Sequence, residues 1–144
     1  MIKIKFIVAA LLAIGILLVG GGCASSENVA AGLGQEFTLA VGQTATIQDE
    51  QLKIKFVEVI GDSRCPSDVQ CIWQGEVSCK LEITLQGTTD TKVLTQPGLT
   101  QGPAISDFAG YQLQFNVQPY PKSGKKIQTM DYRLQMTVTK KPSS

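Results

Sequence analysis

The feature that most constrains this chain is a hydrophobic period of two. Between residues 76 and 85, apolar side chains occupy every second position opposite polar and charged ones: Val77, Cys79, Leu81, Ile83 and Leu85. Such alternation is typical of a β-strand with one buried face and one face in water. After residue 34 no segment offers a convincing helical period. We therefore expect a folded part made of strands.

The same alternation recurs in other segments bounded by turn residues. The expected strands cover 36–41, 44–48, 52–59, 76–85, 91–95, 111–117 and 132–138. The parity breaks at Phe56-Val57, where we expect a β-bulge. About seven strands with one apolar face each predict an all-β fold, a single antiparallel β-sandwich or barrel-like domain over residues 35–144.

Two longer connections are expected between these strands. Residues 96–110 contain two prolines and three glycines and are predicted to form a long loop. A second connection begins at Pro119 and carries Lys122, Lys125 and Lys126. Such a basic turn is usually a solvated tip, and contact with an acidic surface is the alternative.

The N-terminus has the order of a secretory signal. Lys3 and Lys5 provide a positive start, residues 6–19 are uncharged and almost wholly apolar, and three glycines lead into Cys23. The segment resembles a bacterial lipoprotein signal, although Gly20 stands where such signals usually carry leucine.

This resemblance implies that residues 1–22 are removed and that Cys23 becomes the lipidated first residue. Residues 23–34 would then form the lipidated cysteine and a flexible tether. We expect an exported protein, lipid-anchored to the cell membrane or outer membrane. An uncleaved membrane anchor and plain secretion are the alternatives.

Composition excludes several classes of function. Thirteen basic residues oppose twelve acidic ones, and there is no basic run, so nucleic-acid binding is not expected. The chain has no histidine, which excludes Ser-His-Asp and Cys-His nucleophiles and histidine-liganded metal sites. We expect neither a metal nor another cofactor.

The cysteines divide into three roles. With Cys23 assigned to lipid, Cys65 and Cys71 flank a proline-containing turn and are expected to form a disulfide in an oxidising compartment. Closing this short loop should stabilise the fold by about 2–3 kcal/mol. Cys79 lies on the inward parity of its strand and is expected to remain a buried thiol.

The most distinctive segment spans residues 62–76 and has the pattern D-S-R-C-P-x-x-V-x-C-x-W-x-G-E. It resembles a family of uncharacterised bacterial lipoproteins and secreted β-domains. The resemblance is close over residues 37–85 and weaker over 111–121. It implies an exported all-β domain and carries no activity that could be transferred.

Five residues of this segment are candidates for a binding loop: Asp62, Arg64, Asp68, Trp73 and Glu76. We expect Trp73 to close one end of the core beside the disulfide, and an exposed ligand platform is the alternative. Arg64 is expected to hold the loop through charge-assisted hydrogen bonds to the nearby carboxylates. A calcium site built from the three carboxylates is a further alternative, which the guanidinium disfavours.

These observations predict a non-enzymatic, membrane-tethered lipoprotein whose disulfide-stapled domain binds a partner or supports the cell envelope. The expected partners are membrane lipid, through Cys23, and an unknown protein or envelope component. Inhibition of an extracellular protease by a rigid loop is one alternative. The other is an extracellular hydrolase that uses paired carboxylates or a Ser-Lys dyad.

Overall fold

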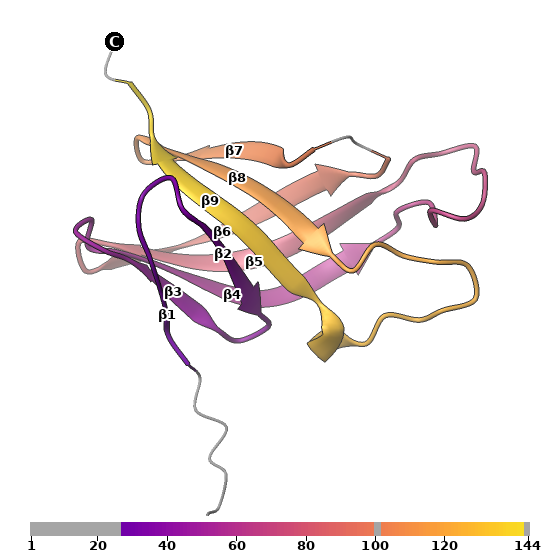
Figure 1. Ribbon diagram of the computed structural model, residues 1–144, viewed down its shortest axis with the longest axis horizontal. Helices are drawn as coiled ribbons and strands as arrows, with labels where there is room; N and C mark the ends of the chain where they lie inside the picture. The colour runs from indigo at the N-terminus through magenta and orange to yellow at the C-terminus, as the bar shows by residue number, and fades with distance from the viewer. Residues whose placement is uncertain (1–26, 100–101, 143–144) are drawn as a thin grey trace, which may run out of the picture.

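Two β-sheets pack face to face in the computed structural model, which describes residues 27–99 and 102–142 (Figure 1). The five-stranded sheet has the order β1 (Val29–Ala31), β3 (Thr44–Ile47), β4 (Leu52–Asp62), β5 (Glu76–Leu85) and β6 (Thr88–Pro97). The four-stranded sheet has the order β2 (Glu36–Ala40), β9 (Arg133–Lys140), β8 (Tyr111–Gln118) and β7 (Ala104–Phe108). The predicted antiparallel β-sandwich is confirmed. The expected signal segment 1–22 and Cys23 lie outside the described residues.

The core lies between the two sheets and consists of the inward side chains that the alternation predicts. Phe56 and Leu81 from one sheet, and Phe115 and Leu134 from the other, are at most 1% exposed. Burying each such side chain contributes about 1.5–3 kcal/mol relative to leaving it exposed. The predicted bulge after Phe56 is confirmed by a register shift in the pairing of β4 with β5.

Two expectations about irregular segments are wrong. Residues 104–108 form β7, which pairs antiparallel with β8, so the expected loop over 96–110 is much shorter. The tether was predicted to reach residue 34, but residues 29–31 form β1, which pairs parallel with β3. Both strands are short edge strands. β1 pairs with a segment 16 residues further along the chain, which no local pattern reveals. β7 instead forms a tight hairpin with β8 through Ala109 and Gly110, both at positive φ.

The chain contains little helix where the structure describes it. The single helical element there is the short 3₁₀ turn η1 (Thr129–Asp131), which lies between β8 and β9. Across residues 27–99 and 102–142, no helix has the length and apolar character needed to cross a membrane.

Three connections gather at one end of the sandwich, on the right in Figure 1. They are the β4–β5 connection (63–75), the described residues of the β6–β7 connection (98–99 and 102–103) and residues 119–128 after β8. Backbone hydrogen bonds join them: Gly98 donates to the Gly75 carbonyl at 2.8 Å, and Ser67 donates to the Pro121 carbonyl at 3.0 Å. We call this region the loop end.

Candidate functional site

The β4–β5 connection, residues 63–75, is here called the stapled loop. Its stem continues the pairing of the two strands, because the Ser63 N–H donates to the Glu76 carbonyl at 2.8 Å. Further out, the Cys65 N–H donates to the Gln74 carbonyl at 2.9 Å. The loop is therefore a structured extension of the β4–β5 hairpin.

The disulfide between Cys65 and Cys71 closes the outer part of this loop, as the sequence predicts. The two Cα atoms are 5.9 Å apart. Cys79 is a free, buried thiol, which confirms the prediction from strand parity. Burial raises the pKa of the Cys79 thiol to about 12, so the reactive thiolate is disfavoured at neutral pH.

Glycine is required where the stem meets its neighbours. Gly75 has a φ of +65°, and a Cβ at this position would collide with the carbonyl oxygen of Ser63. A Cβ on Gly98 would collide with the carbonyl oxygen of Gln74. The glycine of the sequence motif thus permits a close backbone approach that any side chain would prevent.

Arg64 forms the base of the loop end. Its side chain is 1% exposed and pairs bidentately with Asp62, at 2.8 Å from Nε to Oδ1 and 2.6 Å from Nη2 to Oδ2. The same guanidinium donates to the carbonyl oxygens of Val117, at 2.7 Å, and Pro119, at 3.0 Å. Its Cζ atom lies over the ring of Tyr120, 4.8 Å from the ring centroid. Arg64 therefore joins β4 to the end of β8, across the two sheets.

The charge of Asp62 depends on this arrangement. Burial raises its pKa, but the hydrogen bonds and positive charge of Arg64 and the hydroxyl of Tyr132 together outweigh burial and hold the pKa below its ordinary value. The Tyr132 hydroxyl donates to Asp62 at 3.1 Å. Burial and the Asp62 charge raise the pKa of Tyr132 to about 12. At neutral pH the cluster is therefore an ion pair between a carboxylate and a guanidinium, with a neutral phenol hydroxyl bonded to the carboxylate. We call Asp62, Arg64 and Tyr132 the Arg64 clamp.

The other two carboxylates do not join the Arg64 cluster. Asp68 accepts a 2.7 Å hydrogen bond from the Ser123 N–H and so holds residues 119–128 against the stapled loop. Glu76 contributes its backbone groups to the stem, and its side chain is exposed. The expected network is confirmed for Asp62 alone. The three carboxylates form no metal-binding group within the residues that the structure describes.

Trp73 contradicts the expectation that it closes the core. It is 82% exposed, and its neighbour Ile72 is 92% exposed. Both follow the disulfide on a loop that extends beyond the ends of the strands of the other sheet, so no opposing strand covers them (Figure 1). Arg64 and Cys65, which are 4% and 3% exposed, fill this end of the core instead. We call Ile72, Trp73 and the 45% exposed Val69 the tip.

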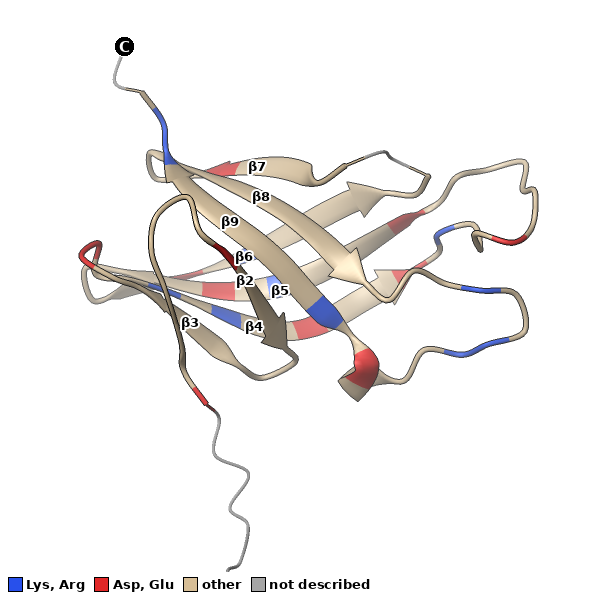
Figure 2. Cartoon of the chain, in the orientation of Figure 1, with Lys and Arg blue, Asp and Glu red and all other residues tan. Residues whose placement is uncertain are grey.

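Residues 119–128 are here called the basic loop. It carries Lys122, Lys125 and Lys126, all exposed, and is seen in Figure 2 as the connection with blue segments at the loop end. An open hollow of about 330 Å³ is formed by this segment and η1. The residues that line it are Pro119, Tyr120, Lys122, Lys125, Lys126, Ile127 and Asp131.

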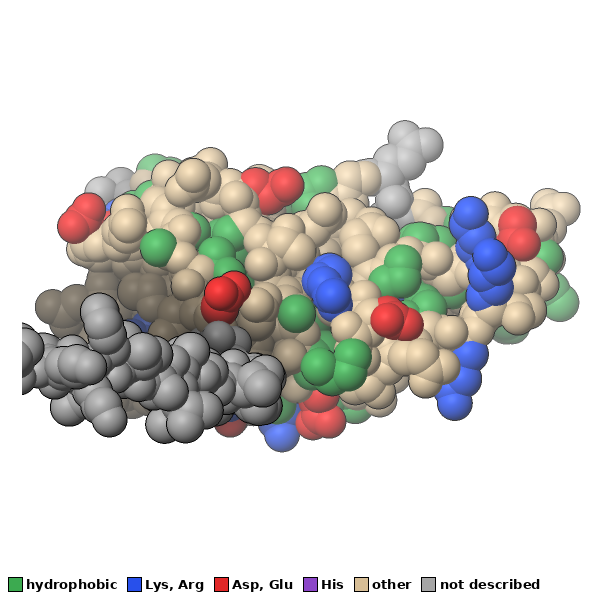
Figure 3. All heavy atoms as spheres, turned by 60° about the horizontal axis from the view of Figure 1, so that its bottom comes forward, with side chains coloured by type: hydrophobic (Ala, Val, Ile, Leu, Met, Phe, Trp, Pro, Cys, Tyr) green, Lys and Arg blue, Asp and Glu red, His purple; other side chains and the backbone are tan. Residues whose placement is uncertain are grey.

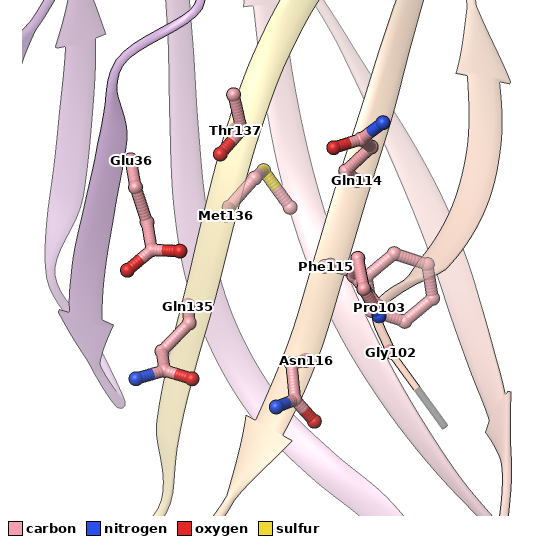
Figure 4. A pocket seen from close by; sticks show the side chains of 9 residues that line it. All are labelled: Glu36, Gly102, Pro103, Gln114, Phe115, Asn116, Gln135, Met136 and Thr137. Atoms are coloured by element: carbon pink, nitrogen blue, oxygen red, sulfur yellow. The ribbon is translucent and has the colours of Figure 1, made fainter. Parts of the chain in front are cut away.

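A separate hollow of about 160 Å³ lies over β8 and β9 and is bordered by Gly102 and Pro103 of the β6–β7 connection (Figure 4). Amides and a hydroxyl from Gln114, Asn116, Gln135 and Thr137 line it, and Glu36 is its single titratable residue. A hydrolase with paired carboxylates needs a second acidic group in such a pocket. This hollow therefore does not support that alternative.

Three residues of the loop end are not singled out by the sequence analysis: Val69, Ile72 and Tyr120. A signal for Tyr120 exists, because it lies between Pro119 and Pro121, which restrict the backbone around it. Its hydroxyl accepts a 2.9 Å hydrogen bond from the Leu99 N–H. Ile72 has no such signal, because an apolar residue beside a tryptophan is equally compatible with a core position.

Comparison with known proteins identifies no relative of the chain. No protein-family model matches the chain, and no curated protein or solved structure matches it.

Proposed function

We propose that this chain is an exported lipoprotein, tethered through Cys23, whose β-sandwich presents the tip of the stapled loop to a protein partner without catalysing a reaction. The observation that carries this proposal is the 82% exposure of Trp73.

Several characteristic residues of the motif have a role inside the chain. The two cysteines bond to each other, Arg64 pairs with Asp62, and Gly75 permits the close approach of the stem. Trp73 gains little from folding, because most of its ring stays in water. Exposed apolar patches of this kind mark interaction sites, and tryptophan is enriched among residues that dominate binding energy.

The loop is also pre-organised for binding. The disulfide, the stem hydrogen bonds and the Arg64 clamp hold its backbone before any partner arrives. Ordering a free loop on binding costs conformational entropy, and a loop held in advance avoids most of that cost. A rigid scaffold that presents an exposed aromatic tip favours binding over catalysis.

The expected tether places the partner near the membrane. Six Cα–Cα steps separate Cys23 from Val29, the first residue of β1. Fully extended, this segment spans about 20 Å. A lipid on Cys23 would therefore keep the domain close to the membrane surface, where an envelope protein is within reach.

The test is site-specific photo-crosslinking in cells that produce the full chain. A photoreactive amino acid replaces Ile72 in one variant and Ile105, which is 58% exposed on β7, in the control. We expect a protein adduct from position 72, little from position 105, and loss of the adduct when Trp73→Ala is added. The proposal would be overturned if position 72 gave no protein adduct, or if the yield of the adduct did not change when Trp73→Ala was added. An adduct with a protease would favour the inhibitor alternative for the same tip.

A further inference from the structure

We infer that the partner surface is acidic: a protein segment that places an apolar side chain on the tip and carboxylate side chains on the basic loop. The inference rests on the proposed function of the tip and adds the chemistry of what binds there.

The tip and the basic loop belong to one connected surface. The Ser67 N–H, inside the disulfide ring, donates to the Pro121 carbonyl at 3.0 Å. In return, Asp68 of the same ring accepts from the Ser123 N–H at 2.7 Å. Two hydrogen bonds thus fix the basic loop against the stapled loop, so a partner that covers the tip also approaches the lysines.

The lysines of this surface lack carboxylate partners. Other lysines form ion pairs within 4.0 Å, namely Lys55, Lys80, Lys140 and Lys141. In the described part of the chain, no ion pair involves Lys122, Lys125 or Lys126. In the space-filling view, basic side chains gather at the right-hand end of the molecule (Figure 3).

Nearby acidic groups do not remove this positive character. Asp62 is already neutralised by Arg64. The carboxylates of Asp68 and Asp131 accept hydrogen bonds from the backbone of the basic loop, at Ser123 and Gln128. The basic loop and the two aspartates bonded to it therefore carry three positive and two negative charges, a net charge of +1. The exposed Glu76 lines a different hollow, beside Ile60 and Ser78. The net positive charge favours an acidic partner.

The shape of the surface favours a protein side chain over a membrane. The 330 Å³ hollow is lined by the apolar residues Pro119, Tyr120 and Ile127, by the three lysines and by one acidic residue, Asp131. A second hollow of about 230 Å³ shares Lys125, Lys126 and Ile127 and is also lined by Tyr132 and by Asp62, whose charge is paired with Arg64. In the complex we infer, a glutamate side chain places its methylene groups against the apolar residues and its carboxylate near the lysines. A flat layer of lipid headgroups would not fill these hollows.

The test uses the fluorescence of Trp73, which is the single tryptophan of the chain and therefore reports on the tip alone. The full chain is placed in phosphatidylcholine nanodiscs and titrated with a blocked peptide, Glu-Glu-Leu-Glu-Glu, and with its uncharged counterpart, Gln-Gln-Leu-Gln-Gln. We expect a saturable blue shift with the acidic peptide and binding of the uncharged peptide weaker by about tenfold or more, since each exposed ion pair contributes modestly.

Matched lysine variants test whether the positive charge of the basic loop is what binds the acidic peptide. Combining Lys122→Gln, Lys125→Gln and Lys126→Gln should weaken acidic-peptide binding about tenfold and make it insensitive to salt. Combining Lys53→Gln with Lys92→Gln removes two lysines of β4 and β6 that form no ion pair with any described residue, and it should leave binding unchanged. Circular dichroism of each variant confirms that the fold is intact.

Three results would overturn the inference. The first is an equal response to both peptides, the second is no saturable response to either, and the third is binding unaffected by the lysine triple variant. A blue shift that appears without peptide, only in nanodiscs made of equal parts phosphatidylglycerol and phosphatidylcholine, would assign the surface to anionic lipid instead. If the in-cell adduct from position 72 persists while the lysine triple variant changes nothing, the tip remains a protein-binding site and only its proposed acidic partner is wrong.

Discussion

The Arg64 guanidinium, two residues beyond the end of β4, donates a 2.7 Å hydrogen bond to the carbonyl oxygen of Val117 on β8. This bond links the two sheets at the loop end, where the strands end and a buried arginine stands in place of inward apolar side chains. Because Arg64 also neutralises the buried Asp62, one side chain satisfies a carboxylate and closes the core. The exposed tip is thus built on a polar but fully paired base.

Removing the Arg64 charge should strongly destabilise the domain. Arg64→Met leaves the Asp62 carboxylate buried without its partner, which typically costs about 3–5 kcal/mol. We expect the free energy of unfolding, measured by urea denaturation, to fall by that order. Arg133→Met is the control, because Arg133 is exposed and binds only nearby carbonyl groups. Equal stability of Arg64→Met and the parent would show that the clamp is dispensable.

The Asp62–Arg64 pair also predicts a pH dependence. The folded-state pKa of Asp62 lies below its ordinary value of 3.8, so the folded state binds its proton less readily than the unfolded state. The stabilisation is therefore fully present above the ordinary pKa and is lost as the pH falls through the lower folded pKa. Urea denaturation at a series of acidic pH values should show this loss. Asp62→Asn should flatten the acidic limb, and an unchanged limb would assign the loss to other carboxylates.

Trp73 should contribute little to stability despite its size. Because the side chain is 82% exposed, Trp73→Ala should change the melting temperature only slightly. Phe115→Ala is the control, since a buried aromatic of this kind costs about 3–5 kcal/mol when truncated. The parent tryptophan should emit at long wavelength and be readily quenched by acrylamide. Strong protection from acrylamide would mean that Trp73 is covered in solution.

The three cysteines of the domain should behave differently. Replacing Cys65 and Cys71 by serine together should lower the free energy of unfolding by about 2–3 kcal/mol. In the folded parent, Cys79 should resist iodoacetamide, because burial raises its pKa to about 12 and blocks access. Unfolding in urea should release one reactive thiol in the domain. Peptide mapping that joins Cys79 to either partner would contradict the pairing.

The proposed lipid anchor predicts the start of the mature protein. Intact-mass and N-terminal peptide measurements should place the first residue at Cys23, with added mass from lipid. Cys23→Ser should shift the protein from the detergent phase to the aqueous phase or block its processing. An unmodified Cys23, or retention of residues 1–22, would leave the domain without the proposed tether.

The sequence by itself determined which side chains face the core. Val77, Leu81 and Ile83 are buried as predicted, because the pleat of a strand sends alternate side chains to opposite faces wherever it pairs. The Cys65–Cys71 disulfide was also predictable from local sequence, since the two cysteines are six positions apart and a proline-containing turn between them brings the thiols together.

Only the tertiary structure decided what covers each position at the loop end. Arg64 reaches Val117, which is 53 residues away in sequence, and no local pattern encodes that contact. The exposure of Trp73 depends on where the opposite sheet ends, so an aromatic residue beside a disulfide is compatible with a core plug or a binding tip. Burial is a property of what lies across the sandwich, and strand parity describes only the strand itself.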